Sequence, residues 1–334
     1  MLKVGLIGCG GMGGTHASAY TNLKDRVSVV AVADLDEKKA GKIAELVGGA
    51  KVYTTGEELI ANETVDYVDI CLPTFLHAKH AVMAMGKGFH VFMEKPVCLN
   101  EEEACLLLET QKKTGAQVQI GQVIRFWDEY VWLKQVVEEG TYGKVVSGVF
   151  QRLSPAPKWS WNEWYHHPEM SGTAALDMHI HDVDYIRYLM GEPKKITANA
   201  ARDENGVLQQ MFVMYEYDGA VITAEGGWDF PDNYPFSMNF RVKLEKATIT
   251  YDIDGLTVYT TDGRKIKPEL QKAVNADIGL GLNVSDLGAY FNELEYFTRR
   301  LSEGKPLEKA PLDEAVKSAR LVWAEIEQCG GTVK

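Results

Sequence analysis

The feature that most restricts the fold is a glycine-rich turn near the start of the chain, in the segment GLIGCGGMGGTHA. Gly8, Gly10 and Gly13 have G-x-G-x-x-G spacing, follow an apolar run at 3–8 that is typical of a buried strand, and open a helix expected near 13–22. Glycines permit a tight turn and a close backbone approach, and a helix N-terminus presents free N–H groups to a pyrophosphate. The turn is therefore predicted to bind a dinucleotide. The predicted cofactor-binding residues in it are Gly8, Gly10, Gly11, Met12 and Gly13.

An acidic residue stands where the ribose of such a dinucleotide would bind. The strand pattern at 27–34 ends in Asp34, about 20 residues after the glycine turn. A carboxylate there accepts hydrogen bonds from the ribose hydroxyls and repels a 2′-phosphate, which favours NAD over NADP. Two alternatives stay open: Asp34 only caps the next helix, and Lys38 with Lys39 leaves room for NADP.

The first third of the chain alternates short apolar runs with helical patterns. Strands are expected at 3–8, 27–34, 67–73, 90–96 and 116–121, and helices at 13–22, 36–47, 76–86 and 101–114. Strands that alternate with helices of this length form right-handed βαβ units. A parallel sheet is therefore predicted for this part.

After about residue 122 the pattern changes to strand-like alternation. Strand-forming segments are expected at 144–154, 209–228 and 236–252, with Asp-Gly turns at 218–219, 254–255 and 262–263, and helices at 128–139, 174–190 and 312–328. Asp-Gly turns are typical of β-hairpins. A second α+β domain with one broad antiparallel sheet is therefore predicted, and the sequence contains no internal repeat.

Composition excludes several classes of partner. The 334 residues carry a net charge of −12, from 35 basic and 47 acidic side chains, and no stretch concentrates lysine or arginine. Such a surface repels phosphate backbones and anionic lipids, so we expect no nucleic-acid partner and no membrane partner. No apolar run approaches the ~18 residues of a membrane span. The five cysteines have no C-x-x-C spacing, which indicates reduced, mostly buried thiols and a cytoplasmic protein. They are Cys9, Cys71, Cys98, Cys105 and Cys329.

Further motifs follow the glycine turn in a characteristic order. Pro73-Thr74-Phe75-Leu76-His77 closes one strand, and Glu94-Lys95-Pro96 ends the next one at the carboxyl edge, where a doubly wound sheet places its ligands. The segments R-F-x-x-E-Y at 125–130 and SGTAALDMHIHDVD at 171–184 come later. In this order and spacing, and through essentially the whole chain, the set resembles the glucose–fructose oxidoreductase, inositol dehydrogenase and MocA (Gfo/Idh/MocA) family.

The resemblance implies a fold class and a type of reaction. The expected fold is α/β, with an N-terminal Rossmann dinucleotide-binding domain at 1–122 and a C-terminal α+β domain at 123–334. The second domain is expected to contain a large, mostly antiparallel open sheet, through which a homodimer or homotetramer forms. Most members of the family are NAD(P)-dependent dehydrogenases or reductases of sugars and cyclic polyols such as inositols.

The resemblance also assigns roles to residues of this chain. Lys95 resembles the active-site lysine, with Glu94 beside it in the same motif, and Asp177 with His181 matches the family's D-x-x-x-H helix. His179 stands where the family often has a small residue, so it either reshapes the pocket or makes a subunit contact. The residues expected to contact the cofactor on the nicotinamide side are Pro73, Thr74, His77, Glu94 and Lys95.

The segment ALDMHIHDVD at 175–184 is predicted to be helical. On an α-helix Asp177, His181 and Asp184 share one face, whereas His179 points to the opposite side. Four histidines lie between 166 and 181, which leaves a metal site as an alternative, but no HxxxH or HExxH pair is present. A second alternative is structural packing. A proton relay without a metal ion is favoured.

The expected chemistry divides between three side chains. His181 suits general acid–base work near neutral pH. Asp177, one turn earlier, would orient the imidazole and stabilise its cation. Lys95 would stabilise negative charge on the substrate oxygen. Together they would handle the proton while a secondary alcohol loses hydride to the nicotinamide.

Aromatic residues gather upstream of the same segment. Five of the seven tryptophans fall between 127 and 164, and WSWNEWYHH at 159–167 is the candidate substrate loop. Trp161 and Trp164 are expected to stack on the apolar face of a sugar or cyclitol, although a core or oligomer contact is an equal alternative. Arg125 is expected to bind a carboxylate or phosphate of the substrate, or else to form a structural ion pair.

Two other functions remain as alternatives. One is an enzyme with tightly held NAD that oxidises and reduces within one turnover, so that it eliminates or epimerises its substrate. The other is a non-enzymatic NAD-binding regulator. The presence of Lys95, Asp177 and His181 together favours an enzyme.

Overall fold

The computed structural model describes residues 1–158, 160–270 and 288–333. Internal contacts divide these residues into two compact units, one made of 1–126 with 288–316 and the other of 127–270 with 317–333. The units are therefore discontinuous in sequence. The predicted second domain begins at residue 123, whereas 123–126 and 288–316 pack within the first unit.

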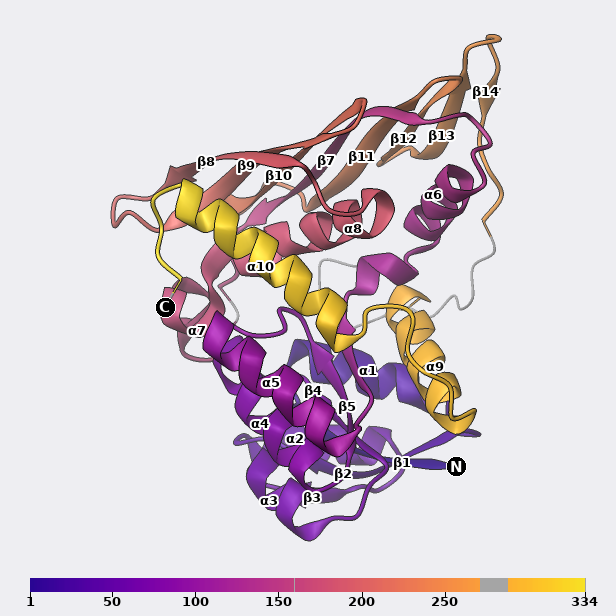
Figure 1. Ribbon diagram of the computed structural model, residues 1–334. Coiled ribbons are helices and arrows are strands. Elements are labelled where there is room, and N and C mark those ends of the chain that lie inside the picture. Colours follow the sequence, from indigo (N-terminus) through magenta and orange to yellow (C-terminus); the bar gives the residue numbers. More distant parts are fainter. Residues whose placement is uncertain (159, 271–287, 334) are drawn as a thin grey trace. The chain divides into compact units, whose positions relative to one another are not determined.

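The first unit is built on a six-stranded parallel sheet with the strand order β3-β2-β1-β4-β5-β6 (Figure 1). Nearly every side chain of β1, β4, β5 and β6 is buried, which explains their continuous apolar runs. The strands are β1 (Leu2–Ile7), β2 (Val27–Ala33), β3 (Lys51–Tyr53), β4 (Tyr67–Ile70), β5 (His90–Glu94) and β6 (Val118–Gly121).

The helices of this unit begin and end where local chemistry requires. The side chains of Asp36, Thr55 and Asn100 accept backbone N–H groups at the starts of α2, α3 and α5. Gly115 ends α5 in a left-handed conformation, with φ of 70°. The helices are α1 (Gly11–Thr21), α2 (Glu37–Leu46), α3 (Gly56–Asn62), α4 (His77–Gly86), α5 (Glu101–Thr114) and α9 (Gly288–Ser302), with 3₁₀ turns at Thr74–Leu76 and Val123–Phe126.

Helix α9 belongs to the core of the first unit although it follows the second sheet in sequence. Phe297 is fully buried, and its ring lies 5.1 Å from that of Tyr67 on β4 and 5.5 Å from that of Phe92 on β5. Farther along the chain, the amide N–H of Ile120 on β6 donates to the carbonyl of Ala310. The segment after α9 therefore covers the open edge of the parallel sheet.

The second unit contains an eight-stranded sheet with the order β14-β13-β12-β11-β7-β10-β9-β8. Only β7 and β10 pair in parallel, and every other neighbouring pair is antiparallel. Gly219, Gly255 and Gly263 have positive φ in the three predicted Asp-Gly turns. The strands are β7 (Val145–Pro155), β8 (Lys195–Arg202), β9 (Leu208–Tyr217), β10 (Ala220–Phe230), β11 (Ser237–Leu244), β12 (Ala247–Asp252), β13 (Gly255–Thr260) and β14 (Lys265–Ile266).

One face of this sheet packs against helices through an aromatic core. The Tyr130 ring of α6 lies 4.7 Å from that of Tyr185 on α8 and 5.0 Å from that of Phe240 on β11. No helix of the described residues covers the opposite face (Figure 1). The helical segments are α6 (Asp128–Glu138), a 3₁₀ turn (Trp161–His166), α7 (Pro168–Ser171), a π-helical turn (Ala175–His179), α8 (Ile180–Met190) and α10 (Leu312–Gln328), whose residues from 317 belong here.

The predicted fold class is confirmed: a parallel Rossmann sheet precedes a large, mostly antiparallel sheet. Sequence reasoning missed β3, α3, β8 and α9. The continuous α-helix predicted at 174–190 is wrong in its first part, which is a π-turn. None of the five cysteines, all of which are described, forms a disulfide, but only Cys9 and Cys98 are buried, whereas Cys71 and Cys329 are partly exposed and Cys105 is exposed. Among the described residues, no helix combines the length and apolarity that crossing a membrane requires.

The place of α9 leads to a stability prediction. Phe297→Ala should lower the free energy of unfolding by about 3–5 kcal/mol, because it leaves a cavity between α9 and the parallel sheet. Urea denaturation followed by circular dichroism measures the change. Leu106→Ala, at a side chain on α5 that is 47% exposed, is the control and should change it by about 0.5 kcal/mol or less. Equally small changes in both variants would contradict a core role for α9.

Candidate active site

The glycine turn has the geometry that a dinucleotide requires. Gly8 has φ of +95°, and a Cβ at Gly13 would overlap the carbonyl oxygen of Gly8. A Cβ at Gly10 would meet nothing within 4 Å, so the space in front of the turn is open. No side chain caps the start of α1, and Gly11 and Met12, in its first turn, are partly exposed. These free N–H groups at a positive helix end fit a pyrophosphate.

Asp34 lies beside this turn, just after β2. One of its carboxylate oxygens accepts the N–H of Cys9 at 2.7 Å, and the other accepts the N–H of Asp36 at 2.8 Å. The side chain that caps α2 is that of Asp36, which accepts from the N–H groups of Lys38 and Lys39. The alternative that Asp34 is merely the helix cap is therefore wrong. The carboxylate is partly exposed and anchored to the glycine turn.

Two motifs meet near the carboxyl ends of β4 and β5. His77, which is 1% exposed, lies with Nδ1 2.8 Å from the carbonyl oxygen of Pro96 and with Nε2 2.7 Å from that of Leu72. Burial lowers the pKa of His77, and the two carbonyl groups oppose this effect. Thr74 is buried and Pro73 is partly exposed. The predicted segments 73–77 and 94–96 are thus joined by direct contacts.

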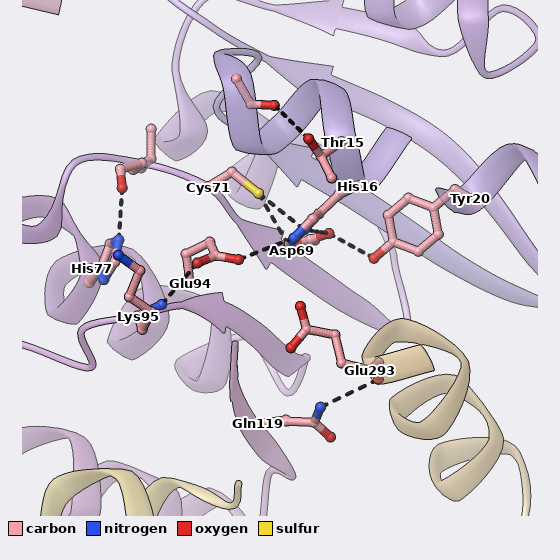
Figure 2. Close-up of polar contacts among 12 residues, drawn as sticks. Thr15, His16, Tyr20, Asp69, Cys71, His77, Glu94, Lys95, Gln119 and Glu293 are labelled. Atoms are coloured by element: carbon pink, nitrogen blue, oxygen red, sulfur yellow. Dashed lines mark hydrogen bonds and ion pairs between the residues drawn. The ribbon is translucent and has the colours of Figure 1, made fainter. Parts of the chain in front are cut away.

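Lys95 follows β5 directly and is partly exposed, whereas Glu94 is buried. The backbone N–H of Lys95 donates to Glu94 Oε2 at 3.2 Å (Figure 2). The peptide bond between Lys95 and Pro96 is cis. Gly121 on β6 makes room for the Glu94 carboxylate, because a Cβ there would lie 2.9 Å from Oε1.

Beneath this edge lies a buried polar cluster that sequence reasoning missed (Figure 2). His16 on α1 has Nδ1 2.9 Å from Asp69 Oδ2 and Nε2 3.2 Å from Glu94 Oε1. The Tyr20 hydroxyl donates to Asp69 at 2.7 Å. Glu293 of α9 is fully buried, and its carboxyl group points toward these residues. The sequence did contain a signal, since an aspartate in the middle of the buried strand YVDI needs a partner.

In the second unit, the segment with the predicted acid–base residues has an unusual burial pattern. From Thr173 to Arg187 every side chain is buried except those of Asp177 and His181, which are partly exposed. The π-turn at Ala175–His179 runs into α8 at this point, and π-turns within helices are frequent at functional sites. Asp184, predicted on the same face, is instead fully buried and accepts from the Ser318 hydroxyl at 2.7 Å.

His179 faces the interior of the second unit. It is fully buried, with Nε2 3.0 Å from Glu325 Oε2 on α10, and the Tyr215 hydroxyl donates to the other oxygen of Glu325 at 2.8 Å. A Cβ at Gly226 would collide with His179, so this glycine makes room for the histidine. His179 therefore links the π-turn to α10 and the sheet, and its full burial does not fit a direct subunit contact.

The predicted substrate loop packs beside the same segment. The Trp164 ring stacks on that of Tyr165 at 4.0 Å, and Tyr165 packs against a small core that includes Met178 and Trp228. Trp161 is 51% exposed. Trp159, at the start of the predicted loop, lies outside the described residues.

Arg125 belongs to the first unit, at the 3₁₀ turn after β6, and its side chain is only 2% exposed. Such burial is more typical of a structural ion pair, the alternative given for Arg125, than of contact with a substrate.

The histidines between 166 and 181 do not gather around one point. His166 contacts the carbonyl oxygen of Pro157, and His167 lies 3.6 Å from Glu169 on the surface. In the part of the chain that the structure describes, the sets of side chains whose ligand atoms lie close enough together to hold a metal ion both include His16 instead.

The fold and the glycine turn together define a dinucleotide-binding protein with a separate second domain. Residues 2–122 match the description of an oxidoreductase family with an NAD-binding Rossmann fold, and residues 130–250 match the C-terminal domain of the same family. The chain belongs to the Gfo/Idh/MocA family of NAD-binding oxidoreductases.

The individual proteins that the chain resembles share a third or less of its residues over the matched regions. The chain is 33% identical over 191 residues to myo-inositol 2-dehydrogenase of Thermotoga maritima, a match that covers 57% of this chain and 55% of that protein. It is 26% identical over 244 residues to 2,7-anhydro-N-acetylneuraminate hydratase of Escherichia coli, covering 70% and 64% of the two chains. A structure of levoglucosan dehydrogenase with NADH and levoglucosan has the same fold, with a TM-score of 0.84, 22% identity and coverage of 98% and 97%.

The His179 contacts predict a structural effect. His179→Ala should lower the free energy of unfolding by about 3–5 kcal/mol, because it removes the imidazole from the buried Glu325 carboxyl group and leaves it with the Tyr215 hydroxyl. Chemical denaturation measures this loss. The double variant His179→Ala/Glu325→Gln should recover part of it, since the buried group is then uncharged. If the double variant is no more stable than the single one, the contact between His179 and Glu325 is not the source of the loss.

Proposed function

We propose that the protein is an NAD-dependent dehydrogenase that interconverts a secondary hydroxyl of a sugar or cyclic polyol with the corresponding ketone. The observation that carries the proposal is the selective exposure of Asp177 and His181 in an otherwise buried helical segment. Membership in an NAD-binding oxidoreductase family supports it. A carboxylate one turn before an imidazole is the arrangement that orients a general base.

The first unit is proposed to bind the cofactor. The turn at 8–13 would contact the pyrophosphate, and Asp34 would accept the ribose hydroxyls and disfavour a 2′-phosphate. Pro73, Thr74 and His77 would line the nicotinamide side. When bound, NAD supplies the acceptor for the hydride that leaves the substrate carbon.

The remaining task for the chain is to move one proton and stabilise charge on one oxygen. His181 would take the hydroxyl proton during oxidation and return it during reduction. Asp177 would hold the imidazole in the required orientation and stabilise its cation. We propose that Lys95 acts on the same substrate oxygen, where its ammonium group would stabilise developing alkoxide charge.

The substrate is proposed to be a polyhydroxylated ring. Trp164 offers an indole already stacked on Tyr165 and close in sequence to Asp177, and indole faces bind the apolar faces of sugar rings. Trp161 has half of its surface free for the same purpose. The relatives named for inositol and levoglucosan support a ring of this kind.

One relative favours a second candidate function. The name of the Escherichia coli hydratase denotes addition or removal of water rather than net oxidation. The same residues could serve such a reaction if NAD stays bound and is reduced and reoxidised within each turnover.

A substrate panel decides between the two candidates. Sugars, inositols and anhydrosugars are incubated with the protein and NAD or NADP, with absorbance of the reduced cofactor and product mass followed in parallel. Net accumulation of NADH is expected for the dehydrogenase. A new product without NADH would establish the second candidate. The absence of any turnover with either cofactor across the panel would count against both.

Variants test the assigned roles once a substrate is found. His181→Asn should lower kcat by roughly 10²–10⁴-fold, the usual contribution of general acid–base catalysis. Lys95→Met should lower it by a comparable factor because alkoxide charge loses its stabilising cation. NAD affinity should stay nearly unchanged in His181→Asn. Normal turnover in either variant would remove that residue from the mechanism.

The face of the second sheet that no helix of the described residues covers is proposed to bind a second copy of the chain. Phe212, Val221 and Tyr259 are 41–45% exposed on it, and Phe212 and Val221 lie on the paired strands β9 and β10. Phe212→Lys should shift the protein from oligomer to monomer in light scattering after size-exclusion chromatography. Leu106→Lys on α5 is the control and should leave the mass unchanged. An oligomer that withstands Phe212→Lys would place the interface elsewhere.

A further inference from the structure

The segment that carries Lys95 is fixed from both sides by buried histidines. After Lys95, His77 contacts the carbonyl oxygen of Pro96 at 2.8 Å. Before it, Glu94 accepts the Lys95 backbone N–H, and His16 lies 3.2 Å from the other oxygen of that carboxylate. His16 therefore reaches the lysine segment through one intervening side chain.

Two carboxylates flank the His16 imidazole. Nδ1 lies within hydrogen-bond distance of both oxygens of Asp69, at 3.1 and 2.9 Å, whereas Nε2 lies 3.2 Å from Glu94 Oε1 at an ion-pair distance without hydrogen-bond alignment. A neutral imidazole carries only one N–H, so one of its nitrogen lone pairs would then face a carboxylate. Only the imidazolium brings a positive charge to both carboxylates. Packing restricts rotation of the His16 ring, because the side chain is fully buried and its ring packs edge-on against that of Phe92, with 5.5 Å between the ring centres.

Charge balance leads to the same protonation state. Asp69, Glu94 and Glu293 would place three negative charges in a dry interior if all were ionised beside a neutral His16, and such a cluster takes up protons instead. Burial alone would lower the pKa of His16, but Asp69 overrides this effect and raises it well above its usual range. The titratable groups that surround His16 are Tyr20 on α1, Tyr67 and Asp69 on β4, Cys71 after β4, Glu94 on β5 and Glu293 on α9.

Glu293 completes the balance as a neutral acid. Burial, together with the nearby Glu94 carboxylate, raises the pKa of Glu293 well above its usual range. Neither of its carboxyl oxygens has a hydrogen-bond partner among the described residues, and a buried carboxylate without partners is far less stable than the acid.

We propose that His16 is a positioning residue for Lys95. As an imidazolium between Asp69 and Glu94, it holds the Glu94 carboxylate against the Lys95 backbone N–H, and this contact fixes the backbone position of Lys95. The inference rests on the proposed function, in which Lys95 acts on the substrate oxygen. Asp69 anchors the imidazolium, and the protonated Glu293 closes the cluster on the side of α9.

Two substitutions at His16 separate positioning from general stability. The amide nitrogen of asparagine lies near the place of Nδ1 and retains the contact with Asp69, whereas that of glutamine lies near Nε2 and retains the contact with Glu94. Both remove the positive charge. His16→Asn should lower kcat by roughly 10–100-fold, the scale of a misplacement of about 1 Å. His16→Gln should recover most of this loss, while KM and NAD affinity change by about threefold or less in both.

His90 supplies the matched control. It lies at the opposite end of β5, half-buried, with Nδ1 accepting the N–H of Gln117, so His90→Asn and His90→Gln should leave kcat unchanged. Loss of kcat in parallel with thermal stability in both His16 variants, with no advantage for glutamine, would overturn the positioning role. Lys95→Met is run beside them. If it abolishes turnover while His16→Asn is normal, only the positioning role fails. If Lys95→Met itself turns over normally, the proposed function fails.

A bound cation is the competing explanation of the cluster, because ligand atoms of His16, Glu94 and Glu293 lie within 4.8 Å of one another. Metal analysis of the purified NAD-loaded protein should show no stoichiometric zinc. Glu293→Gln, which mimics the neutral acid, should keep the thermal unfolding temperature of the parent. Stoichiometric zinc that disappears in Glu293→Gln would overturn the proton-based account.

Discussion

Parallel pairing of β1, β2, β4 and β5 is the constraint on which the candidate site depends. Because these strands point the same way, their carboxyl ends meet at one edge. The glycine turn follows β1, Asp34 follows β2, the 73–77 segment follows β4 and Lys95 follows β5. Residues distant in sequence thus come to one edge through backbone hydrogen bonding alone. Side-chain contacts then adjust this arrangement, as the bond from the Cys9 N–H to Asp34 illustrates.

The second unit positions its candidate residues by a different means. Its candidate residues lie on a helical segment and not at a sheet edge. In that segment, from Thr173 to Arg187, Asp177 and His181 are partly exposed and every other side chain is buried. Several of those neighbours are polar, and each needs a partner to be buried. Asp182 pairs with Arg152 at 3.1 Å, and Asp184 accepts from Ser318. The result is a buried support on which two polar side chains are partly exposed.

Sequence reasoning succeeded where the signal was local. The glycine spacing, the strand runs and the Asp-Gly turns each depend on a few adjacent residues, and the structure reproduces them. It failed where the answer depends on distant partners. The amphipathic pattern of α9 does not reveal which sheet it covers, and the three-residue β3 is too short to show a periodicity. Asp184 was misjudged because helical spacing places it near His181, whereas Ser318, 134 residues away, determines its burial.

The same limit explains why the His16 cluster was overlooked and why its position matters. A buried ion pair is a poor source of stability, because removing two charges from water offsets most of their attraction. Apolar side chains could fill the space between α1 and the sheet at least as well. His16 and Asp69 nevertheless occupy it, fully buried, directly beneath the strand end that precedes Lys95. An arrangement that contributes little to stability, yet touches the segment carrying the proposed catalytic lysine, is best understood through the geometry it maintains there.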